Sequence, residues 1–484
     1  MIKWILFVIV ISLLVVTPGV VAKSKPDIFQ EITTQTPFKL IQPIIGVDLL
    51  PQSGKELLTM GVDEQGQRWI AVYLYDQKSN QFKIASKLAI PKPFLQFDLS
   101  EYQEGSLQQL YFMTASALFV FEPQANKFSF IADIDSIYLE DKPQFISRGS
   151  FVHQWFGQQD NILITGFNQI SLLTINQGKV VNSQTLPIKP TVSLSSDGVR
   201  FNQKKFYLTD TNFDAKDDLI LVGDGSLIVY QQQDNGNFSA EALLIKINSS
   251  ISGVEWWTKR DEMGNQLDQT DLVYRKLEEL RDLNNDGIPD MVVRFTKSSG
   301  VLDRSNDYEV FLGINNNNQL SFSAKANSVI RADGTLTGLQ FVDIDNDNKM
   351  EVLLAGFDIG LSQIIGALLS GSIDQDVFLF KMDGSNNYGT KPKISKEVEL
   401  NFSISSGQSG SPVVQLADIN GDGLKDLILS NGDDQLRVYM GNKGKRLFAK
   451  RSKKFRTQLP QDSGSMIVED INGDGKEDLI IKHS

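Results

Sequence analysis

A nine-residue segment rich in aspartate recurs in the second half of the chain and constrains the fold more than any other feature. It has Asp or Asn at positions 1, 3 and 5, glycine at position 6 and an acid at position 9. The three intact copies run from Asp282 to Asp290, from Asp418 to Asp426 and from Asp470 to Asp478. Each copy leads directly into apolar residues, which predicts a tight turn followed by a buried strand. Such a repeat indicates an architecture assembled from copies of one unit.

Two further copies keep the spacing with altered residues. In the segment from Asp343 to Glu351, Asn348 takes the glycine position and glutamate takes position 9. In the segment from Asp210 to Asp218, Ala215 takes the glycine position. Asparagine adopts the left-handed backbone more readily than alanine, so we expect the first segment to bind like the intact copies. For the second segment, binding stays an open question.

Oxygen ligands at alternate positions of a tight loop suit a calcium ion, with a main-chain carbonyl at position 7. The loops differ from EF-hands, because position 12 holds Val293, Leu429 or Ile481 instead of a bidentate glutamate. The acid at position 9 must therefore close the site. One Asp/Asn/Gly cluster alone would indicate only a turn, but three intact copies favour Ca²⁺. The predicted ligands are Asp282, Asn284, Asp286, Asp290, Asp343, Asp345, Asp347, Glu351, Asp418, Asn420, Asp422, Asp426, Asp470, Asn472, Asp474 and Asp478.

Short apolar segments between Gly/Asn-rich turns recur along the chain and predict an all-β fold. Pairs such as Val229-Tyr230 and Val438-Tyr439 follow the hairpins as further strands. Each unit is predicted to be a four-stranded antiparallel sheet, and such sheets arranged in a ring form a β-propeller. We expect eight blades, with seven as the alternative. The last hairpin lacks outer strands, which residues 28–40 would supply, closing the ring by pairing of the N- and C-terminal segments.

The aspartate loops, the apolar strand after each and the blade-like spacing resemble FG-GAP/VCBS repeats, a family of calcium-loop propeller units also found in integrin α-subunits. The resemblance covers residues 205–484 with specific motifs and residues 41–204 through degenerate repeats only. It implies that each loop joins the first two strands of a blade and that calcium is chiefly structural. We therefore expect residues 23–484 to form one propeller domain.

The N-terminus has the layout of a secretory signal peptide. Lys3 precedes an apolar run from Trp4 to Val16, and small residues lie before Lys23. The run is shorter than the ~20 residues that a membrane span needs, although an uncleaved anchor is the alternative. We expect residues 1–22 to be removed, leaving no transmembrane span, and the protein to be exported to the periplasm or surface of a bacterial-type cell. The chain has no cysteine, which excludes disulfides and Cys-ligated zinc.

The charge of the chain limits its partners. With 47 Lys plus Arg against 59 Asp plus Glu, the net charge of -12 argues against nucleic acid as a ligand. A basic run from Lys443 to Arg456 stands out against this background. It fits either a contact for a polyanion or a solvated outer strand whose lysines protect a sheet edge, and the edge interpretation is favoured.

Catalytic patterns are scarce. His153 and His483 are the only histidines, and the sequence has no nucleophile elbow, phosphate-binding loop or dinucleotide fingerprint. We expect a non-catalytic binding or scaffolding protein of the cell envelope, with a protein or glycan ligand. The alternative is a calcium-dependent carbohydrate-active enzyme of the polysaccharide-lyase type, or a phytase-like hydrolase, because propellers host both kinds of function.

Overall fold

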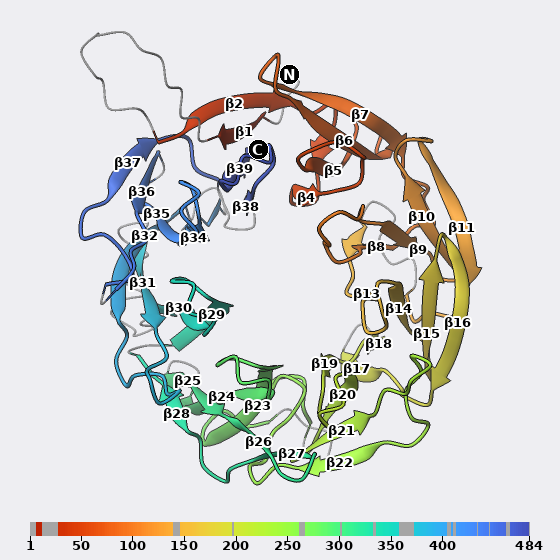
Figure 1. Ribbon diagram of the computed structural model, residues 1–484, viewed down its shortest axis with the longest axis vertical. Coiled ribbons are helices and arrows are strands. Elements are labelled where there is room, and N and C mark those ends of the chain that lie inside the picture. Colours follow the sequence, from red (N-terminus) through yellow and green to blue (C-terminus); the bar gives the residue numbers. More distant parts are fainter. Residues whose placement is uncertain are drawn as a thin grey trace.

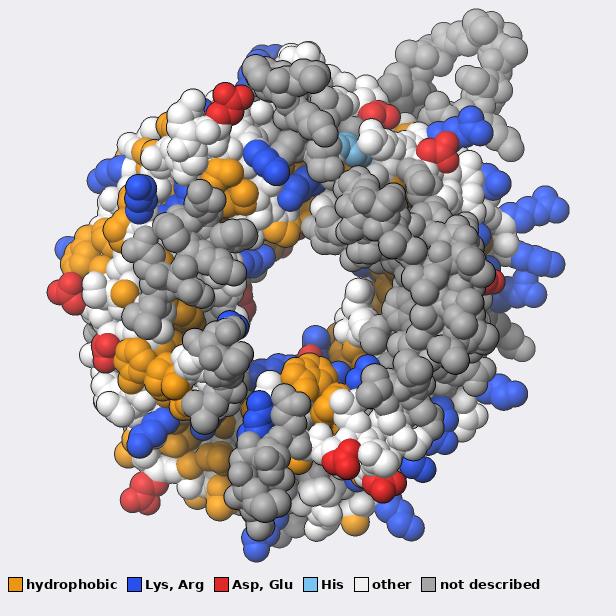
Figure 2. Space-filling view, turned by 180° about the vertical axis from the view of Figure 1, so that it is seen from behind, with side chains coloured by type: hydrophobic (Ala, Val, Ile, Leu, Met, Phe, Trp, Pro, Cys, Tyr) orange, Lys and Arg blue, Asp and Glu red, His pale blue; other side chains and the backbone are white. Residues whose placement is uncertain are grey.

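A computed structural model of the chain describes residues 6–11, 28–138, 146–195, 198–260, 267–300, 303–332, 335–357, 372–403, 408–409, 413–432, 434–444, 446–460 and 465–483. In this part of the chain the secondary-structure elements are β-strands, and no helix is long and apolar enough to cross a membrane. The strands form sheets around a central opening, which Figures 1 and 2 show from opposite faces. The chain is an all-β β-propeller, as its repeats predict.

Four sheets from the first half of the chain are antiparallel meanders, in which successive strands lie farther from the centre, apart from a short parallel strand, β12 (Ser147–Arg148), that is added at the inner edge of the second sheet (Figure 1). The first contains β3 (Lys39–Leu40), β4 (Ile45–Val47), β5 (Glu56–Val62), β6 (Arg68–Asp76) and β7 (Gln81–Ala89). The second contains β8 (Gln96–Leu99), β9 (Leu110–Met113), β10 (Ala117–Glu122), β11 (Lys127–Asp133) and the parallel β12 (Ser147–Arg148). The third contains β13 (Val152–His153), β14 (Asp160–Thr165), β15 (Ile170–Asn176) and β16 (Lys179–Leu186). The fourth contains β19 (Tyr207–Thr209), β20 (Asp218–Gly223), β21 (Ser226–Tyr230) and β22 (Leu243–Lys246).

The next sheet has nine strands and spans two consecutive meanders. The first meander contains β23 (Leu272–Arg281), β24 (Asp290–Gly300), β25 (Asp303–Phe311) and β28 (Ser328–Ile330). The second contains β29 (Thr335–Val342), β30 (Glu351–Phe357), β31 (Ser372–Phe380), β32 (Ile394–Ser403) and β33 (Gln408–Ser409). One parallel pair, Asn306 with Thr335, joins the two. Because this pair merges two units, the described strands form seven large sheets, the alternative count, rather than eight separate ones.

Two more large sheets and two separate hairpins complete the described strands. One sheet contains β34 (Val414–Ala417), β35 (Asp426–Ser430), β36 (Gln435–Tyr439) and β37 (Lys453–Arg456). The other contains β38 (Met466–Glu469), β39 (Asp478–Lys482), β1 (Leu6–Ile11) and β2 (Gln30–Gln35). The hairpins are β17 (Thr191–Ser195) with β18 (Gly198–Asn202), and β26 (Gly313–Asn315) with β27 (Leu320–Phe322).

The sheet that ends the chain also contains residues from its start. β39 pairs with β1, and β1 pairs with β2, so β2 is the outermost strand. We expected residues 28–40 to supply both outer strands. In the structure they supply only the outermost one, because β3 pairs with β5 in the neighbouring sheet. The position next to β39 belongs to residues 6–11, which lie inside the predicted signal peptide.

Apolar side chains fill the space between consecutive sheets. One cluster joins Leu58 and Val72 of the first sheet to Phe97 and Phe112 of the second. Inner strands have neighbours on both faces, which explains why β35 is buried at every position. Outer strands expose one face, and β16 alternates between exposed and partly buried residues. The apolar run after each aspartate loop is therefore an inner strand, held between two blades.

Candidate functional site

Each aspartate loop joins the first two strands of a meander. The loop from Asp418 to Asp426 connects β34 to β35, and the loop from Asp470 to Asp478 connects β38 to β39. The corresponding loops precede β20, β24 and β30. The position-9 acid is the first residue of the second strand in every case. The loop therefore arises where a flexible polar turn meets a strand that is buried between blades.

The backbone of every loop has two left-handed residues, at positions 4 and 6. In the loop from 418 to 426 these are Gly421 (φ 73°) and Gly423 (φ 82°). Asn348 and Ala215 adopt φ angles of 62° and 66° at position 6, so both altered loops keep this conformation. The left-handed conformation was expected from the sequence at position 6 but not at position 4. The signal was available, because position 4 is Asn or Gly in all loops except the one with Phe213 (φ 61°).

The first aspartate faces the interior of its loop. Asp418 Oδ1 accepts hydrogen bonds from the backbone N–H groups of Gly421 and Asp422, at 2.7 and 3.1 Å, and Oδ2 accepts one from Gly423 at 2.7 Å. In all five loops, the position-6 N–H donates to the position-1 carboxylate, at 2.7 to 3.0 Å. These bonds fix the position-1 carboxylate inside the turn.

The closing acid is buried and tied to the backbone. Asp426 is fully buried; Oδ2 accepts a hydrogen bond from Ile419 N–H at 3.2 Å, and Oδ1 accepts one from Gly441 N–H at 2.6 Å. Burial raises the pKa of Asp426 to about 6, that of Asp290 to about 7 and that of Asp478 to about 8. An ionised carboxylate is unfavourable in such surroundings unless a cation neutralises it.

The donors of the three intact loops fit calcium. They are hard oxygen atoms, which Ca²⁺ prefers, and Oδ1 of Asp478 is a buried polar atom without a hydrogen-bond partner. In the altered loop from 343 to 351, oxygen atoms of Asp343, Asp345 and Glu351 lie within 4.8 Å of one another, close enough to share a metal ion. Among the described residues, these three acids are the group whose oxygen atoms lie close enough together for one ion, and the remaining predicted ligands stay predictions.

A lysine lies among the acids of the loop from 343 to 351. Lys381 Nζ donates to Asp345 Oδ1 and Oδ2 at 2.7 and 2.6 Å, to Asp347 Oδ2 at 2.8 Å and to Glu351 Oε1 at 3.2 Å. Burial raises the pKa of Glu351 to about 7, against the opposing effects of the Ile344 N–H and the lysine. The spacing of the loop does not indicate Lys381, because this residue follows β31, the strand that pairs with β30, and lies outside the loop.

The loop from 210 to 218 contains its own cation. Lys216 Nζ lies 3.0 Å from Asp214 Oδ2 and 2.9 Å from Asp234 Oδ1. Asp218 remains fully buried and accepts the Thr211 N–H at 3.1 Å. The degenerate first sheet keeps a related arrangement, since the fully buried Glu56 accepts the Leu49 N–H at 2.8 Å. In the first sheet the closing acid is therefore retained although Leu50 and Gln52 take positions 3 and 5.

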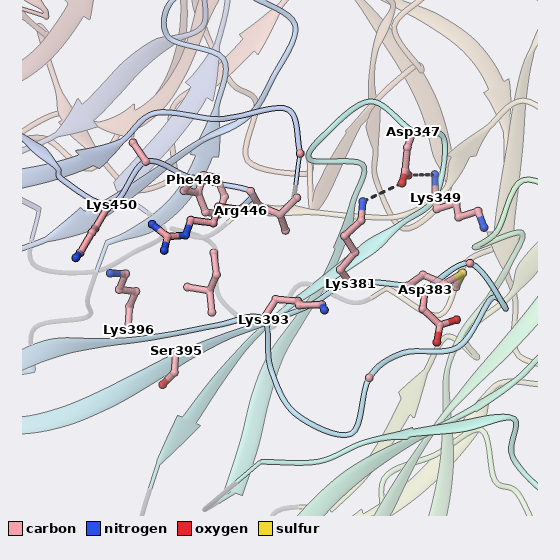
Figure 3. A pocket seen from close by; sticks show the side chains of 17 residues that line it. Asp347, Lys349, Lys381, Asp383, Lys393, Ser395, Lys396, Arg446, Phe448 and Lys450 are labelled. Carbon is pink, nitrogen blue, oxygen red and sulfur yellow. Dashed lines mark hydrogen bonds and ion pairs between the residues drawn. The ribbon is translucent and has the colours of Figure 1, made fainter.

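A basic groove of about 1020 Å³ adjoins the loop from 343 to 351 (Figure 3). Residues that follow β31 line one side, and residues that precede β37 line the other. The basic residues that line it in addition to Lys381 are Lys349, Lys393, Lys396, Arg446 and Lys450. In Figure 3, Lys396, Arg446 and Lys450 gather at one end of the groove, away from Asp383. Cations from three separate chain segments thus converge on one concave surface.

The basic run from Lys443 to Arg456 divides between two environments. Lys453, Lys454 and Arg456 lie on β37, the outermost strand of its sheet, where the edge interpretation places them. Arg446 and Lys450 belong to the preceding loop and line the groove. Basic side chains also project from this part of the rim in Figure 2, on the right.

A smaller cavity of about 400 Å³ lies between the second and third sheets and is lined by Glu122 and by two further acids, Glu101 and Asp160. Tyr111 donates its hydroxyl proton to Asp160 Oδ2 at 2.7 Å. Burial raises the pKa of the Glu101 and Asp160 carboxyls. The two histidines are not part of this cavity.

The fold and its loops define a β-propeller whose blade hairpins carry repeated acidic turns. Residues 282–354 and 418–481 match the family of FG-GAP-like repeats, and these regions contain the three intact loops and the loop with Lys381. The chain therefore contains FG-GAP-like repeats in two regions of a β-propeller. No curated protein matches the sequence.

Solved structures resemble the chain at low identity. A lectin from Agrocybe aegerita that recognises non-reducing terminal N-acetylglucosamine is 11% identical, with a TM-score of 0.41 over 99% of this chain and 95% of the lectin. The Nup133 β-propeller domain of Vanderwaltozyma polyspora is 13% identical, with a TM-score of 0.36 over 86% and 97% of the two chains. A putative 6-phosphogluconolactonase from Bacteroides uniformis is 11% identical, with a TM-score of 0.35 over 80% and 92%. At these values the similarities say nothing about function.

Proposed function

We propose that the protein is an exported, calcium-binding β-propeller that acts as a non-catalytic binding or scaffolding protein of the cell envelope or surface. The observation that carries the calcium assignment is the buried closing acid of each intact loop, which accepts a backbone N–H bond and follows three further oxygen-bearing side chains in the sequence. Calcium would neutralise Asp290, Asp426 and Asp478 and fix each turn to the strand behind it. Its role would be to stabilise the blades.

We propose the basic groove as a binding surface of this scaffold, and a polyanion, namely an acidic glycan, as its ligand. No described carboxylate forms an ion pair with Lys393, Lys396, Arg446 or Lys450. The two acids of the groove are already engaged: Asp347 contacts Lys381, and Asp383 accepts the N–H groups of two residues in its own turn. Lacking a described carboxylate partner, these cations can bind carboxylate or sulfate groups, and the Lys396 ammonium also lies 4.5 Å from the centre of the Tyr439 ring.

The shape and lining of the groove favour a glycan over nucleic acid or a membrane. Phe448, the aromatic residue that lines it, is only 6% exposed and offers no stacking platform for a base. The groove is concave and carries no exposed apolar side chain that would insert into a bilayer. An acidic polysaccharide places repeated anions along a chain that such a groove can accommodate.

Retention on an immobilised acidic polysaccharide tests this surface. The protein should be retained at low salt, and replacing Lys393, Lys396, Arg446 and Lys450 with Gln should abolish retention. The matched control replaces four exposed lysines on other blades, Lys78, Lys179, Lys189 and Lys246, which changes the net charge equally. An equal loss of retention in both variants would show that retention depends only on the net charge of the protein. If the wild type is not retained at low salt, an acidic glycan is excluded as the ligand of the groove.

Export rests on the signal-like N-terminus and is tested by N-terminal sequencing of protein recovered from intact cells. Cleavage before Lys23 would remove β1, which lies between β39 and β2 in this structure. A mature N-terminus near Lys23 in an exported fraction supports the proposal. An intact residue 1 in the folded, cell-associated protein would instead favour β1 as a permanent strand of the last sheet.

The cavity with Glu101 and Asp160 is the one observation that favours the second candidate, a carbohydrate-active or phytase-like enzyme. Two carboxyls with raised pKa values beside a tyrosine are groups that acid–base chemistry can use. Turnover of an acidic polysaccharide or phytate by the purified protein, lost in Asp160→Asn and Glu101→Gln, would establish that function and displace our proposal.

A further inference from the structure

The cation of the loop from 343 to 351 is supplied by the chain itself. The Lys381 ammonium contacts three acids of that loop, at 2.6 to 3.2 Å, and its side chain is only 22% exposed. Glu351 differs from the aspartates at this position by one methylene. Its Oε2 keeps the usual bond from the Ile344 N–H at 2.9 Å, while Oε1 faces the ammonium. The contacts thus include the closing acid, which is fully buried.

The strand register shows which residue takes this place in the other loops. Met382, directly after Lys381, forms a bridge with Tyr388, just as Gly441 does with Phe448 in the next sheet. Lys381 therefore corresponds to Met440, which precedes Gly441. The same comparison through the β26–β27 pair, where Gly313 faces Phe322, assigns Leu312 to this position. In these two intact loops the residue has no charge, so neither receives an ammonium from the neighbouring strand as the altered loop does.

We propose that Lys381 is a tethered cation that takes the place of calcium in the loop from 343 to 351. The inference rests on the proposed calcium binding of the intact loops. An ammonium has three N–H donors and meets the three acids without dehydration of a free ion. It is also intramolecular, so its effective concentration exceeds that of a millimolar solute. Calcium that entered the loop would lie against a like charge and would have to displace these bonds.

The proposal changes the expectation for Asp343, Asp345, Asp347 and Glu351. The sequence predicted them as calcium ligands, and their oxygen atoms do lie close enough together for a metal ion. The ammonium contacts three of these four acids, Asp345, Asp347 and Glu351, without an ion. This blade is thereby independent of calcium, whereas the blades of the intact loops depend on it.

Calorimetric titration with calcium of the variant Lys381→Met tests the proposal. This substitution introduces the residue type of Met440, which holds the corresponding position beside the loop from 418 to 426. Lys381→Met should bind one calcium ion more than the wild type and melt at a lower temperature in chelator. Asp345→Asn in the Lys381→Met background should remove the additional site. Lys393→Met, a lysine of the same groove that does not contact the loop, is the matched control and should change neither value.

Asp345→Asn in the otherwise unchanged protein keeps the test decisive if Lys381→Met does not fold. It should leave the calcium stoichiometry of the wild type unchanged, whereas Asp422→Asn should lower it by one. A loss of one ion in Asp345→Asn, or an unchanged count in a folded Lys381→Met, would overturn the proposal. If the wild type and Asp422→Asn both bind no calcium, the proposed function fails. The effect of Lys381→Met on the melting temperature in chelator would still report on the ammonium.

Discussion

The loops from 418 to 426 and from 343 to 351 have the same backbone conformation. They differ in the group that lies ready to neutralise the negative charge of their acids. Both have left-handed residues at positions 4 and 6, and both hold a fully buried closing acid through the N–H seven residues earlier. In the first loop the residue on the neighbouring strand is Met440; in the second it is Lys381, whose ammonium contacts three acids. The buried acid and the turn are therefore common to both hairpins, whereas the cation that balances the negative charge of the acids can differ between blades.

The largest expected effect is a difference in the stability of calcium-free protein between low and high pH. Burial raises the pKa values of Asp290, Asp426 and Asp478 to about 7, 6 and 8, above the 3.8 of an exposed aspartate. Groups with raised pKa values stabilise the fold fully below their unfolded-state values, and this stability is lost as the pH rises through 6 to 8. In chelator, the urea midpoint should therefore be lower at pH 8 than at pH 5.

Calcium should reverse this trend, because it binds the ionised carboxylates. Replacing the three closing aspartates with Asn should reduce the pH dependence in chelator and remove the effect of calcium. Equal urea midpoints at both pH values in chelator would show that these acids do not carry an uncompensated charge.

The next largest effect compares the closing acids of the two loops. Asp426→Ala removes the acceptor of two buried N–H groups, from Ile419 and Gly441, and should destabilise the protein by roughly 2–4 kcal/mol. Glu351→Ala removes the acceptor of the Ile344 N–H and leaves Lys381 with Asp345 and Asp347, so its effect should be smaller. Urea unfolding measures both, with Asp426→Asn as the control that keeps an acceptor. A larger loss in Glu351→Ala than in Asp426→Ala would contradict the comparison.

The smallest effect concerns the left-handed position 6. Ala215 adopts φ 66°, which costs a non-glycine residue about 1–2 kcal/mol, so Ala215→Gly should stabilise the protein by roughly 0.5–1 kcal/mol after the entropy of glycine is counted. Asn348→Gly should change stability less, because asparagine tolerates φ 62°. Thermal unfolding of the two variants decides this; destabilisation by Ala215→Gly would mean that the loop is not held in this conformation.

Much of the fold could be predicted because the residues that specify each repeat lie close together in the sequence. The aspartate turn and the apolar run after it identify the first hairpin of a blade without reference to the rest of the chain. The sheet count could not be predicted, since it depends on one parallel pair between Asn306 and Thr335, to which no local pattern corresponds. The place of residues 6–11 beside β39 is likewise a long-range pairing, and their composition indicates a signal peptide instead.

The residues of the candidate site could be predicted where they lie close together in the sequence. They could not be predicted where only the fold brings them together. The proposed ligand sets at positions 1, 3, 5 and 9 follow from spacing alone. Lys381 lies 34 positions after Asp347 and reaches it only because β30 pairs with β31. The groove unites Lys349, Lys393 and Arg446 from different turns, and only the packing of neighbouring blades brings them together.

Thermal unfolding of the full chain in calcium and in excess chelator tests most directly whether the intact loops bind calcium. At about 10 mM calcium, loops with dissociation constants of ~10⁻⁴–10⁻³ M should each add roughly 1–3 kcal/mol. The melting temperature should therefore rise with calcium, and Asp422→Ala and Asp474→Ala should each reduce the rise and lower the calcium stoichiometry by one. An identical melting temperature in calcium and in chelator would contradict the account.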